Sequence, residues 1–166
     1  MDDVNDIAAF YNSASKVEEE RLVRHQLEFD LTWRILERFV PPTASILEIG
    51  CGAGAYTVPL TRWGHRITTV DMSERLLERR HARLQESGLD GKVRLVQADA
   101  RNLQAGGADR YETVLLMGLL YHLVCLQDRQ QALSQAVRRL MPGGVMLSAH
   151  ISRFGIMGDL MKNVPA

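Results

Sequence analysis

Acidic side chains close three successive apolar segments of this chain, and a glycine-rich turn follows the first of them. Glu48 lies just before the turn at 50–54, Gly-Cys-Gly-Ala-Gly. Asp71 and Asp99 follow the second and third apolar segments. A glycine turn that opens a helix lets backbone N–H groups approach a ligand, because no side chain stands in the way. Beside such a turn, the carboxylates predict a polar ligand that donates hydrogen bonds.

Asp71 lies 21 residues after Gly50, and two interpretations of it stay open. An acid at this spacing, at the end of the second strand, is placed to accept hydrogen bonds from ribose hydroxyls. Asp71 also precedes Ser73 and could instead cap the helix that begins there. The neighbouring glycine turn favours the ribose interpretation. Asp99 could likewise accept from a purine amino group, or be a solvated loop acid.

Glu48 helps to choose between two classes of ligand for the turn. Gly50, Gly52 and Ala55 match the relaxed dinucleotide fingerprint G-x-G-x-x-G/A, which would place a pyrophosphate on the helix N-terminus. A carboxylate two residues before the first glycine would repel those phosphates, whereas it suits a ligand with a cationic amine. A buried strand carboxylate must otherwise find a donor in the protein, such as a backbone N–H of its own turn.

The elements that must position these groups alternate along the chain. Strand-like segments cover 45–49, 66–70, 93–98, 111–117 and 145–149. Helix-like segments cover 16–40, 55–63, 73–87 and a stretch from Asp128 towards Leu140. This alternation predicts an α/β fold, with helices on both faces of a parallel sheet. Ligands bind beyond the carboxyl ends of such strands, which is where the acids lie.

The first helix, 16–40, is expected to bury an apolar stripe against the core. The stripe recurs every fourth residue and is widened by a set that recurs every seventh: Val23, Leu27, Leu31, Ile35 and Phe39, then Leu22, Phe29 and Leu36. Pro41 and Pro42 end this helix.

Local signals set the bounds of the later elements. Ser73 is expected to cap one helix, and Gly88 to end it. Asp128 and Gln131 resemble a capping box for the last helix. The apolar face of that helix is expected to comprise Ala132, Leu133, Ala136, Val137 and Leu140. The turn at 142–144, Pro-Gly-Gly, leads into the final strand.

Composition favours one globular domain and argues against nucleic-acid and membrane partners. The 166 residues include 20 basic and 20 acidic side chains, and only 6% are aromatic. No surplus of positive charge is available to bind phosphates or an anionic membrane, and no apolar run could span a bilayer. Cys51 and Cys125 show neither a metal spacing nor a disulfide framework. With no signal segment at the N-terminus, a cytoplasmic location is expected.

Four motifs, in order between residues 45 and 151, resemble the class I S-adenosylmethionine-dependent methyltransferases. They are the glycine turn with Glu48, then Val70-Asp71-Met72-Ser73, Ala98-Asp99-Ala100 and Leu140-Met141-Pro142-Gly143-Gly144-Val145. Segments 117–123 and 151–155 are further similar to bacterial small-molecule methyltransferases. The resemblance implies a Rossmann-like, doubly wound, mostly parallel sheet. It also implies in-line transfer of a methyl group from S-adenosyl-L-methionine to a nucleophile on a small molecule.

Two other functions stay open beside this one. A cofactor-binding fragment, or a protein that binds S-adenosylmethionine without turning it over, would show the same motifs. A nicotinamide-dependent oxidoreductase would share the glycine fingerprint, although Glu48 argues against it. Protein acceptors also stay open for a methyltransferase.

The resemblance assigns the first half of the site. Asp71 would bind the ribose hydroxyls of S-adenosylmethionine, and Met72 would pack on its adenine. Glu48 and the turn would hold the methionine moiety, through Gly50, Cys51, Gly52 and Gly54.

The adenine and the open side of the cofactor would meet other segments. Asp99 would accept from the adenine amino group, and Ala100 would donate its backbone N–H to the ring. Met117 would line the floor beside the sulfonium. From the N-terminal segment, Tyr11 could close over the cofactor and Arg21 could reach its carboxylate, although a packed Tyr and a surface Arg are the commoner roles.

His122 and Tyr121, just past the fourth strand, are the candidate catalytic residues. A general base is needed only if the nucleophile arrives protonated, and His122 can take a proton near neutral pH. The alternative is a structural histidine. His150, after the fifth strand, is a weaker candidate, and surface positions are expected for His25, His65 and His81. No combination of these residues has a metal spacing, so no metal is expected.

The C-terminal part departs from the family pattern. The family sheet continues past the fifth strand, whereas this chain reaches Ala166 soon after it. The expected organisation is therefore a helical cover (1–42), a Rossmann-like core (43–151) and a truncated C-terminal segment (152–166). An open sheet edge favours pairing with another chain, so a homodimer is among the expected states.

Overall fold

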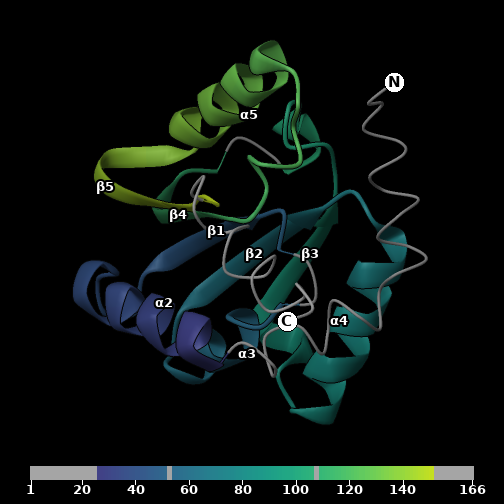
Figure 1. The fold of residues 1–166 in the computed structure, drawn as a ribbon. Helices are drawn as coiled ribbons and strands as arrows, with labels where there is room; N and C mark the ends of the chain where they lie inside the picture. The colour runs from purple at the N-terminus through teal and green to yellow at the C-terminus, as the bar shows by residue number, and fades with distance from the viewer. Residues whose placement is uncertain (1–25, 52–53, 107–108, 152–166) are drawn as a thin grey trace, which may run out of the picture.

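The computed structural model describes residues 26–51, 54–106 and 109–151 (Figure 1). The strands are β1 (Ser45–Ile49), β2 (Arg66–Asp71), β3 (Val93–Gln97), β4 (Tyr111–Met117) and β5 (Leu140–Ala149). The α-helices are α2 (Gln26–Phe39), α3 (Thr57–Arg62), α4 (Glu74–Glu86) and α5 (Leu126–Arg138). Two 3-10 turns, η1 (Asp90–Lys92) and η2 (Leu103–Gly106), flank β3. A strand is thus present in each of the five segments where the apolar pattern predicts one.

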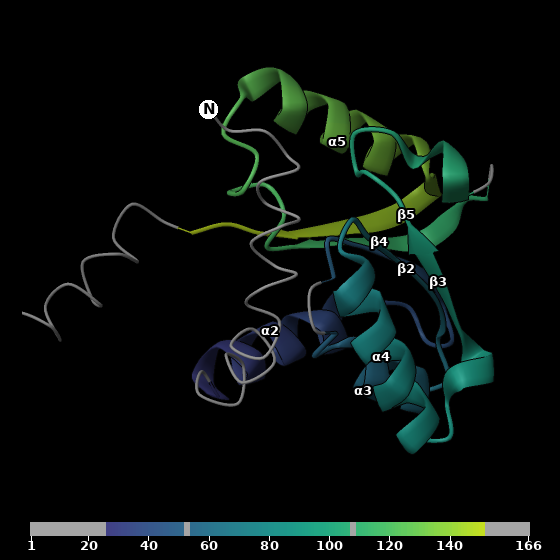
Figure 2. The same ribbon diagram turned by 90° about the vertical axis from the view of Figure 1, so that its right-hand side faces the viewer.

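Within the described residues, the five strands form one sheet in the order β3-β2-β1-β4-β5, and every pairing is parallel. From β1 the chain moves outward through β2 to β3, then returns to place β4 on the other side of β1. Helix α5 covers one face, and α2, α3 and α4 cover the other (Figures 1 and 2). This confirms the predicted doubly wound α/β fold. The reversal between β1 and β4 is the kind of switch point at which such sheets bind ligands.

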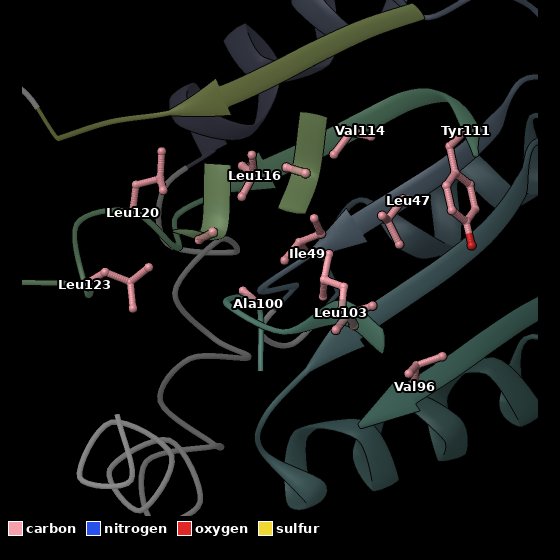
Figure 3. Packing of buried hydrophobic residues seen from close by; sticks show 13 residues of the cluster. Leu47, Ile49, Val96, Ala100, Leu103, Tyr111, Val114, Leu116, Leu120 and Leu123 are labelled. Atoms are coloured by element: carbon pink, nitrogen blue, oxygen red, sulfur yellow. The ribbon is translucent and has the colours of Figure 1, made fainter. Parts of the chain in front are cut away.

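Successive residues of the central strands pack on opposite faces of the sheet. Leu47 and Ile49 of β1 face the cluster that includes Ala132 and Ala136 of α5 (Figure 3). Ile46 of the same strand faces the other cluster, beside Leu36 of α2, Leu60 of α3 and Leu84 of α4. Burial on both faces explains why these strands have nearly continuous apolar sequences.

The predicted apolar face of the first helix is half correct in the described part of that helix: Phe29 and Leu36 of the seventh-residue set pack on the core, but the fourth-residue stripe is wrong. Leu36 is buried, but the fourth-residue stripe is 46–70% exposed: Leu27, Leu31, Ile35 and Phe39. Two aromatic residues of the helix, Phe29 and Trp33, face inward. Phe29 stacks on Tyr56 with a ring separation of 5.4 Å, and Trp33 meets Trp63 edge-on at 4.7 Å. Large aromatic surfaces on the neighbouring segment therefore decide the orientation of α2.

Of the two predicted helix N-caps, the one at Ser73 is confirmed and the one at Asp128 is wrong. Ser73 caps α4, because its hydroxyl accepts the backbone N–H of Leu76 at 3.2 Å, and Gly88 ends that helix with φ of 65°. The capping box at Asp128 is wrong, since α5 begins earlier, at Leu126, and Asp128 lies in its first turn.

The bounds of two elements also need correction. Helix α3 is shorter than the predicted 55–63, and Pro59 sits in its first turn, where its missing N–H is harmless. Leu140 does not end α5 but begins β5, opposite Tyr111. A register shift between Tyr111 and Thr113 accommodates the Pro-Gly-Gly turn inside the strand. None of the helices in the described part of the chain is both long and apolar enough to cross a bilayer.

Candidate functional site

The register of the parallel strands brings the predicted strand-end residues to one edge of the sheet. Ile49 lies opposite Val70, and the backbone N–H of Gly50 donates to the Val70 carbonyl at 2.9 Å. On the next strand pair, Asp71 lies opposite Gln97. The glycine turn after β1, Asp71 as the last residue of β2 and the segment with Asp99 after β3 therefore lie at the ends of three adjacent strands.

Two glycines of the turn are required by its geometry. Gly50 has φ of 65°, and a Cβ there would lie 2.9 Å from the Leu119 side chain. Gly54 has φ of 74°, and a Cβ there would lie 2.5 Å from the Arg80 guanidinium. The positive φ values and the close neighbours both exclude larger residues at these positions. Gly52, also assigned to the turn, lies outside the described residues.

Glu48 lies beneath this turn and is 1% exposed. Its Oε2 accepts a hydrogen bond from Thr57 Oγ1 at 2.6 Å and lies 3.4 Å from Arg80 Nη1. Burial raises the pKa of the Glu48 carboxyl, the Arg80 charge and the Thr57 hydroxyl oppose that rise, and Asp71 adds to it. The required donors thus come from α3 and α4. A contact between Glu48 and a ligand stays a prediction.

Arg80 is the functional candidate that sequence reasoning missed. It is 2% exposed, and it donates to Thr57 Oγ1 and to the Cys51 carbonyl, both at 2.9 Å. The buried face of α4 comprises Leu76, Leu77, Arg80 and Leu84. A lone cation within an apolar stripe at helical spacing was the signal that could have found it.

Asp71 combines features of both interpretations. One carboxylate oxygen, Oδ1, accepts the backbone N–H of Ser73 at 2.9 Å and so helps to shape the start of α4. The other, Oδ2, lies 3.8 Å from Cys51 Sγ of the glycine turn. The side chain is half-buried at the strand end. Ser73 is the cap of α4, and ribose binding by Asp71 stays a prediction.

Asp99 is held by an arginine two residues further on. The Arg101 guanidinium donates to Asp99 Oδ2 at 2.6 and 2.9 Å, and the Arg101 backbone N–H donates to Oδ1 at 2.8 Å. Arg101 also reaches Asp128 of α5 at 3.1 Å, and these hydrogen bonds raise its pKa. Asp99 is therefore ion-paired rather than simply solvated. The contact with α5 also explains the acid at Asp128.

The candidate catalytic residues lie together after β4. The rings of Tyr121 and His122 are 4.5 Å apart, and the His122 backbone N–H donates to the Leu119 carbonyl at 3.0 Å. Gly118 has φ of 106°, and a Cβ there would lie 2.7 Å from the Tyr121 hydroxyl. At the end of β5, His150 Nε2 lies 3.0 Å from Ser148 Oγ. Proton transfer by any of these groups stays a prediction.

Half-buried apolar side chains border the same edge. Met72 and Ala98 pack against the α5-side cluster, and Met117 packs against the opposite one. Ala100 is buried after β3. Such surfaces suit a flat, largely apolar ring, while the carboxylates suit hydroxyl and amino donors.

The remaining candidate residues are those of the N-terminal segment and the histidines that were expected at the surface. Tyr11, Arg21 and His25 lie outside the described residues. The surface position expected for His65 is wrong, because it is 6% exposed and burial lowers its pKa, whereas His81 is exposed. Among residues 26–51, 54–106 and 109–151, no three His, Cys, Asp or Glu side chains gather as metal ligands.

Comparisons with known proteins match the segment that carries these residues. A family model described as a methyltransferase domain matches residues 46–144. The ubiquinone biosynthesis O-methyltransferase of Caulobacter vibrioides is 34% identical over 109 residues, which cover 66% of this chain and 41% of the relative. The chain thus spans about two fifths of that relative's length.

Solved structures show the same fold. The glycopeptide N-methyltransferase MtfA complexed with S-adenosyl-L-methionine superposes with a TM-score of 0.61 at 25% identity, over 72% of this chain and 53% of MtfA. The N-methyltransferase NodS from Bradyrhizobium japonicum WM9, complexed with S-adenosyl-L-homocysteine, superposes with a TM-score of 0.66 at 22% identity. That match covers 83% of this chain and 71% of NodS.

Proposed function

Since the chain belongs to the methyltransferase-domain family, we propose that it binds S-adenosyl-L-methionine and moves the methyl group to a small-molecule acceptor. The observation that carries this proposal is the contact between the glycine turn and Asp71. Cys51 of the turn faces the Asp71 carboxylate at 3.8 Å, at the carboxyl ends of β1 and β2. A backbone-lined turn beside a carboxylate acceptor matches an adenosyl ligand without phosphates.

The described residues fit such a ligand chemically. Asp71 would accept from the ribose hydroxyls, and Met72 would pack on the adenine. Asp99 would accept from the adenine amino group while it keeps Arg101, since each carboxylate oxygen can accept more than one hydrogen bond. Ala100 would donate its backbone N–H to the ring. The complex of MtfA with S-adenosyl-L-methionine supports this choice of cofactor.

The glycine turn and the fourth strand would meet the methionine side of the ligand. The backbone at Gly50, Cys51, Gly52 and Gly54 would hold the methionine moiety from above Glu48. Met117 would line the floor of the site. Tyr11 and Arg21 of the N-terminal segment are proposed to complete it.

Methyl transfer would require no covalent intermediate on the protein. When bound, the cofactor supplies a sulfonium methyl group that is already activated for in-line displacement, with S-adenosyl-L-homocysteine as product. The chain would align acceptor and methyl group and exclude water, and positioning of this kind contributes ~7–11 kcal/mol. His122, with Tyr121 beside it, would take the proton of an acceptor that arrives protonated.

Calorimetric titration tests the cofactor. S-adenosyl-L-homocysteine should bind, and Asp71→Ala should weaken binding by ~1–3 kcal/mol, because a charged hydrogen-bond acceptor is lost. Asp90→Ala is the matched control, since that exposed acid lies before β3, at the end of the sheet opposite Asp71. Binding of NAD but not of S-adenosyl-L-homocysteine would contradict the proposal. So would equal affinities of the wild type and Asp71→Ala.

Transfer of label from methyl-labelled S-adenosyl-L-methionine to candidate acceptors tests the activity itself. His122→Ala should slow transfer to a protonated acceptor and leave cofactor affinity unchanged. Binding without transfer to any acceptor would instead support a non-catalytic S-adenosylmethionine-binding protein.

We also propose the wider setting of the chain. Cys51 and Cys125 are free thiols, which suits a reducing cytoplasm. The equal numbers of acidic and basic residues argue against a nucleic-acid or membrane partner. Among the strands that the structure describes, β5 lies at an edge of the sheet, with half-buried Val145, Met146 and Leu147, which a second copy could cover. Light scattering after gel filtration would report a dimer, and a monomer at all concentrations would contradict it.

A further inference from the structure

Arg80 connects the glycine turn to two elements beneath it. Its Nη1 contacts Glu48 of β1 and Thr57 of α3, and its Nη2 donates to the Cys51 carbonyl at 2.9 Å. The guanidinium also fills the space beneath Gly54, where a Cβ would lie 2.5 Å from Cζ. One side chain of α4 thereby contacts both described ends of the turn.

A cation at this position needs a reason, because it is costly to bury. Removing an arginine from water is offset only by good partners, and a leucine would satisfy the apolar face of α4. What a leucine cannot do is bind a carbonyl of the turn. The hydrogen bond from Arg80 fixes the direction of the Cys51 carbonyl. Arg80 also contacts Glu48 of β1, so it connects the Cys51 carbonyl to the central strand of the sheet.

We propose that Arg80 is a positioning residue of the ligand site, which holds Cys51 and Gly54 of the glycine turn in place before a ligand arrives. Its cation also compensates the buried charge of Glu48, so the turn offers a ligand its backbone groups rather than an uncompensated carboxylate. The effect on cofactor binding rests on the proposed function. The effect on the turn does not, and it can be measured in the ligand-free protein.

The thiol of Cys51 reports the state of the turn directly. Cys51 is half-buried and burial raises its thiol pKa, so it should react slowly with a disulfide reagent such as DTNB. The other cysteine, Cys125, is exposed, and Cys125→Ser removes its signal. In this background, Arg80→Met should speed Cys51 labelling at least about tenfold through local opening, even though loss of the Arg80 charge by itself raises the thiol pKa and slows the reaction. The faster labelling rate should stay constant when small concentrations of urea are added. If labelling required global unfolding, its rate would instead rise with the urea concentration.

Two variants control this measurement. Arg83→Met removes an exposed arginine of the same helix and should leave the labelling rate unchanged. Arg80→Lys keeps the charge but has one ammonium group, which cannot reproduce the fork between Nη1 and Nη2. Arg80→Lys should give a Cys51 labelling rate between those of the wild type and Arg80→Met. If Arg80→Met does not fold, the comparison of Arg80→Lys with the wild type tests whether Arg80 holds the turn.

The same variants are then titrated with S-adenosyl-L-homocysteine. Arg80→Met should bind at least about tenfold more weakly than the wild type, and Arg80→Lys should recover part of the loss, because preorganisation contributes to affinity. Wild-type labelling in the folded Arg80 variant would overturn the hold on the turn. Faster labelling with unchanged affinity would overturn the role in ligand binding. No binding by the wild type would contradict the proposed function alone, since the thiol result would still stand.

Discussion

Two carboxylate–arginine pairs lie at the same edge of this sheet, and they differ in burial rather than in chemistry. Glu48 and Arg80 are 3.4 Å apart, and each side chain is 2% exposed. Asp99 and Arg101 approach to 2.6 Å, but their side chains are 27% and 26% exposed. The shorter contact belongs to the pair that water can also solvate. The distance between the charged atoms therefore does not predict which pair contributes more to stability. The free-energy cost of losing one partner depends on whether water can replace it.

The surroundings of the pairs differ in the same way. Arg80 is shared among Glu48 and Thr57 beneath the turn and the Cys51 carbonyl of the turn itself. Arg101 bridges Asp99 and Asp128 near the surface. The first pair suits a permanent internal anchor, whereas the second can exchange partners with a ligand or with water.

The largest expected effect is the loss of the buried cation. Arg80→Met leaves Glu48 without its countercharge in the interior and should lower the free energy of unfolding by ~3–5 kcal/mol. Arg101→Met, where water replaces the guanidinium, should cost ~1 kcal/mol or less. Urea unfolding of both variants gives the two values. Equal losses would show that burial does not separate the pairs.

A smaller effect is expected when the space beneath the turn is filled. The reference variant is Gly88→Ala, after α4, where no atom lies within 4 Å of the added Cβ. It should lower the free energy of unfolding by ~1–2 kcal/mol, because alanine is forced to a φ of 65°. Gly54→Ala carries the same kind of strain and must also displace the Arg80 guanidinium, so it should cost more. The comparison uses thermal or urea unfolding of both variants. A Gly54→Ala variant no less stable than Gly88→Ala would argue against close packing of Arg80.

The smallest expected effects are slopes of stability against pH. Burial raises the pKa of Glu48 above its ordinary 4.5, so its folded state holds the proton more tightly than the unfolded chain. The contribution of Glu48 is therefore full below pH 4.5 and falls as the pH rises through the raised pKa. Glu48→Gln should remove this fall from unfolding free energies measured from pH 4.5 upward.

Glu112, at the opposite end of the sheet, gives the contrasting sign. The backbone N–H and hydroxyl of Ser45 donate to its carboxylate and lower its pKa below 4.5. Its contribution should be present above pH 4.5 and lost as the pH falls through the lowered pKa. Glu112→Gln should flatten the acid limb only. A change above neutral pH in that variant would contradict the assignment.

Much of the sheet could be predicted because its signals are local. Apolar runs such as Tyr111–Met117 mark strands that are buried on both faces, and Ser73 and Gly88 mark the ends of α4. The acids at the strand ends were found in the same way, since parallel strands bring their carboxyl ends to one edge. The fourth-residue stripe of α2 and the cap at Asp128 were wrong, because each depends on a partner distant in the sequence.

The sequence by itself determined where strands and turns lie, because alternation, glycine and capping residues act over a few neighbouring positions. Only the tertiary structure decided which cation meets which acid. Arg80 lies 32 residues from Glu48, and no local pattern links them. Their pairing follows from the way that α4 packs against the sheet beneath the turn. Burial then determines the energy of the contact, since it controls whether water can replace a lost partner.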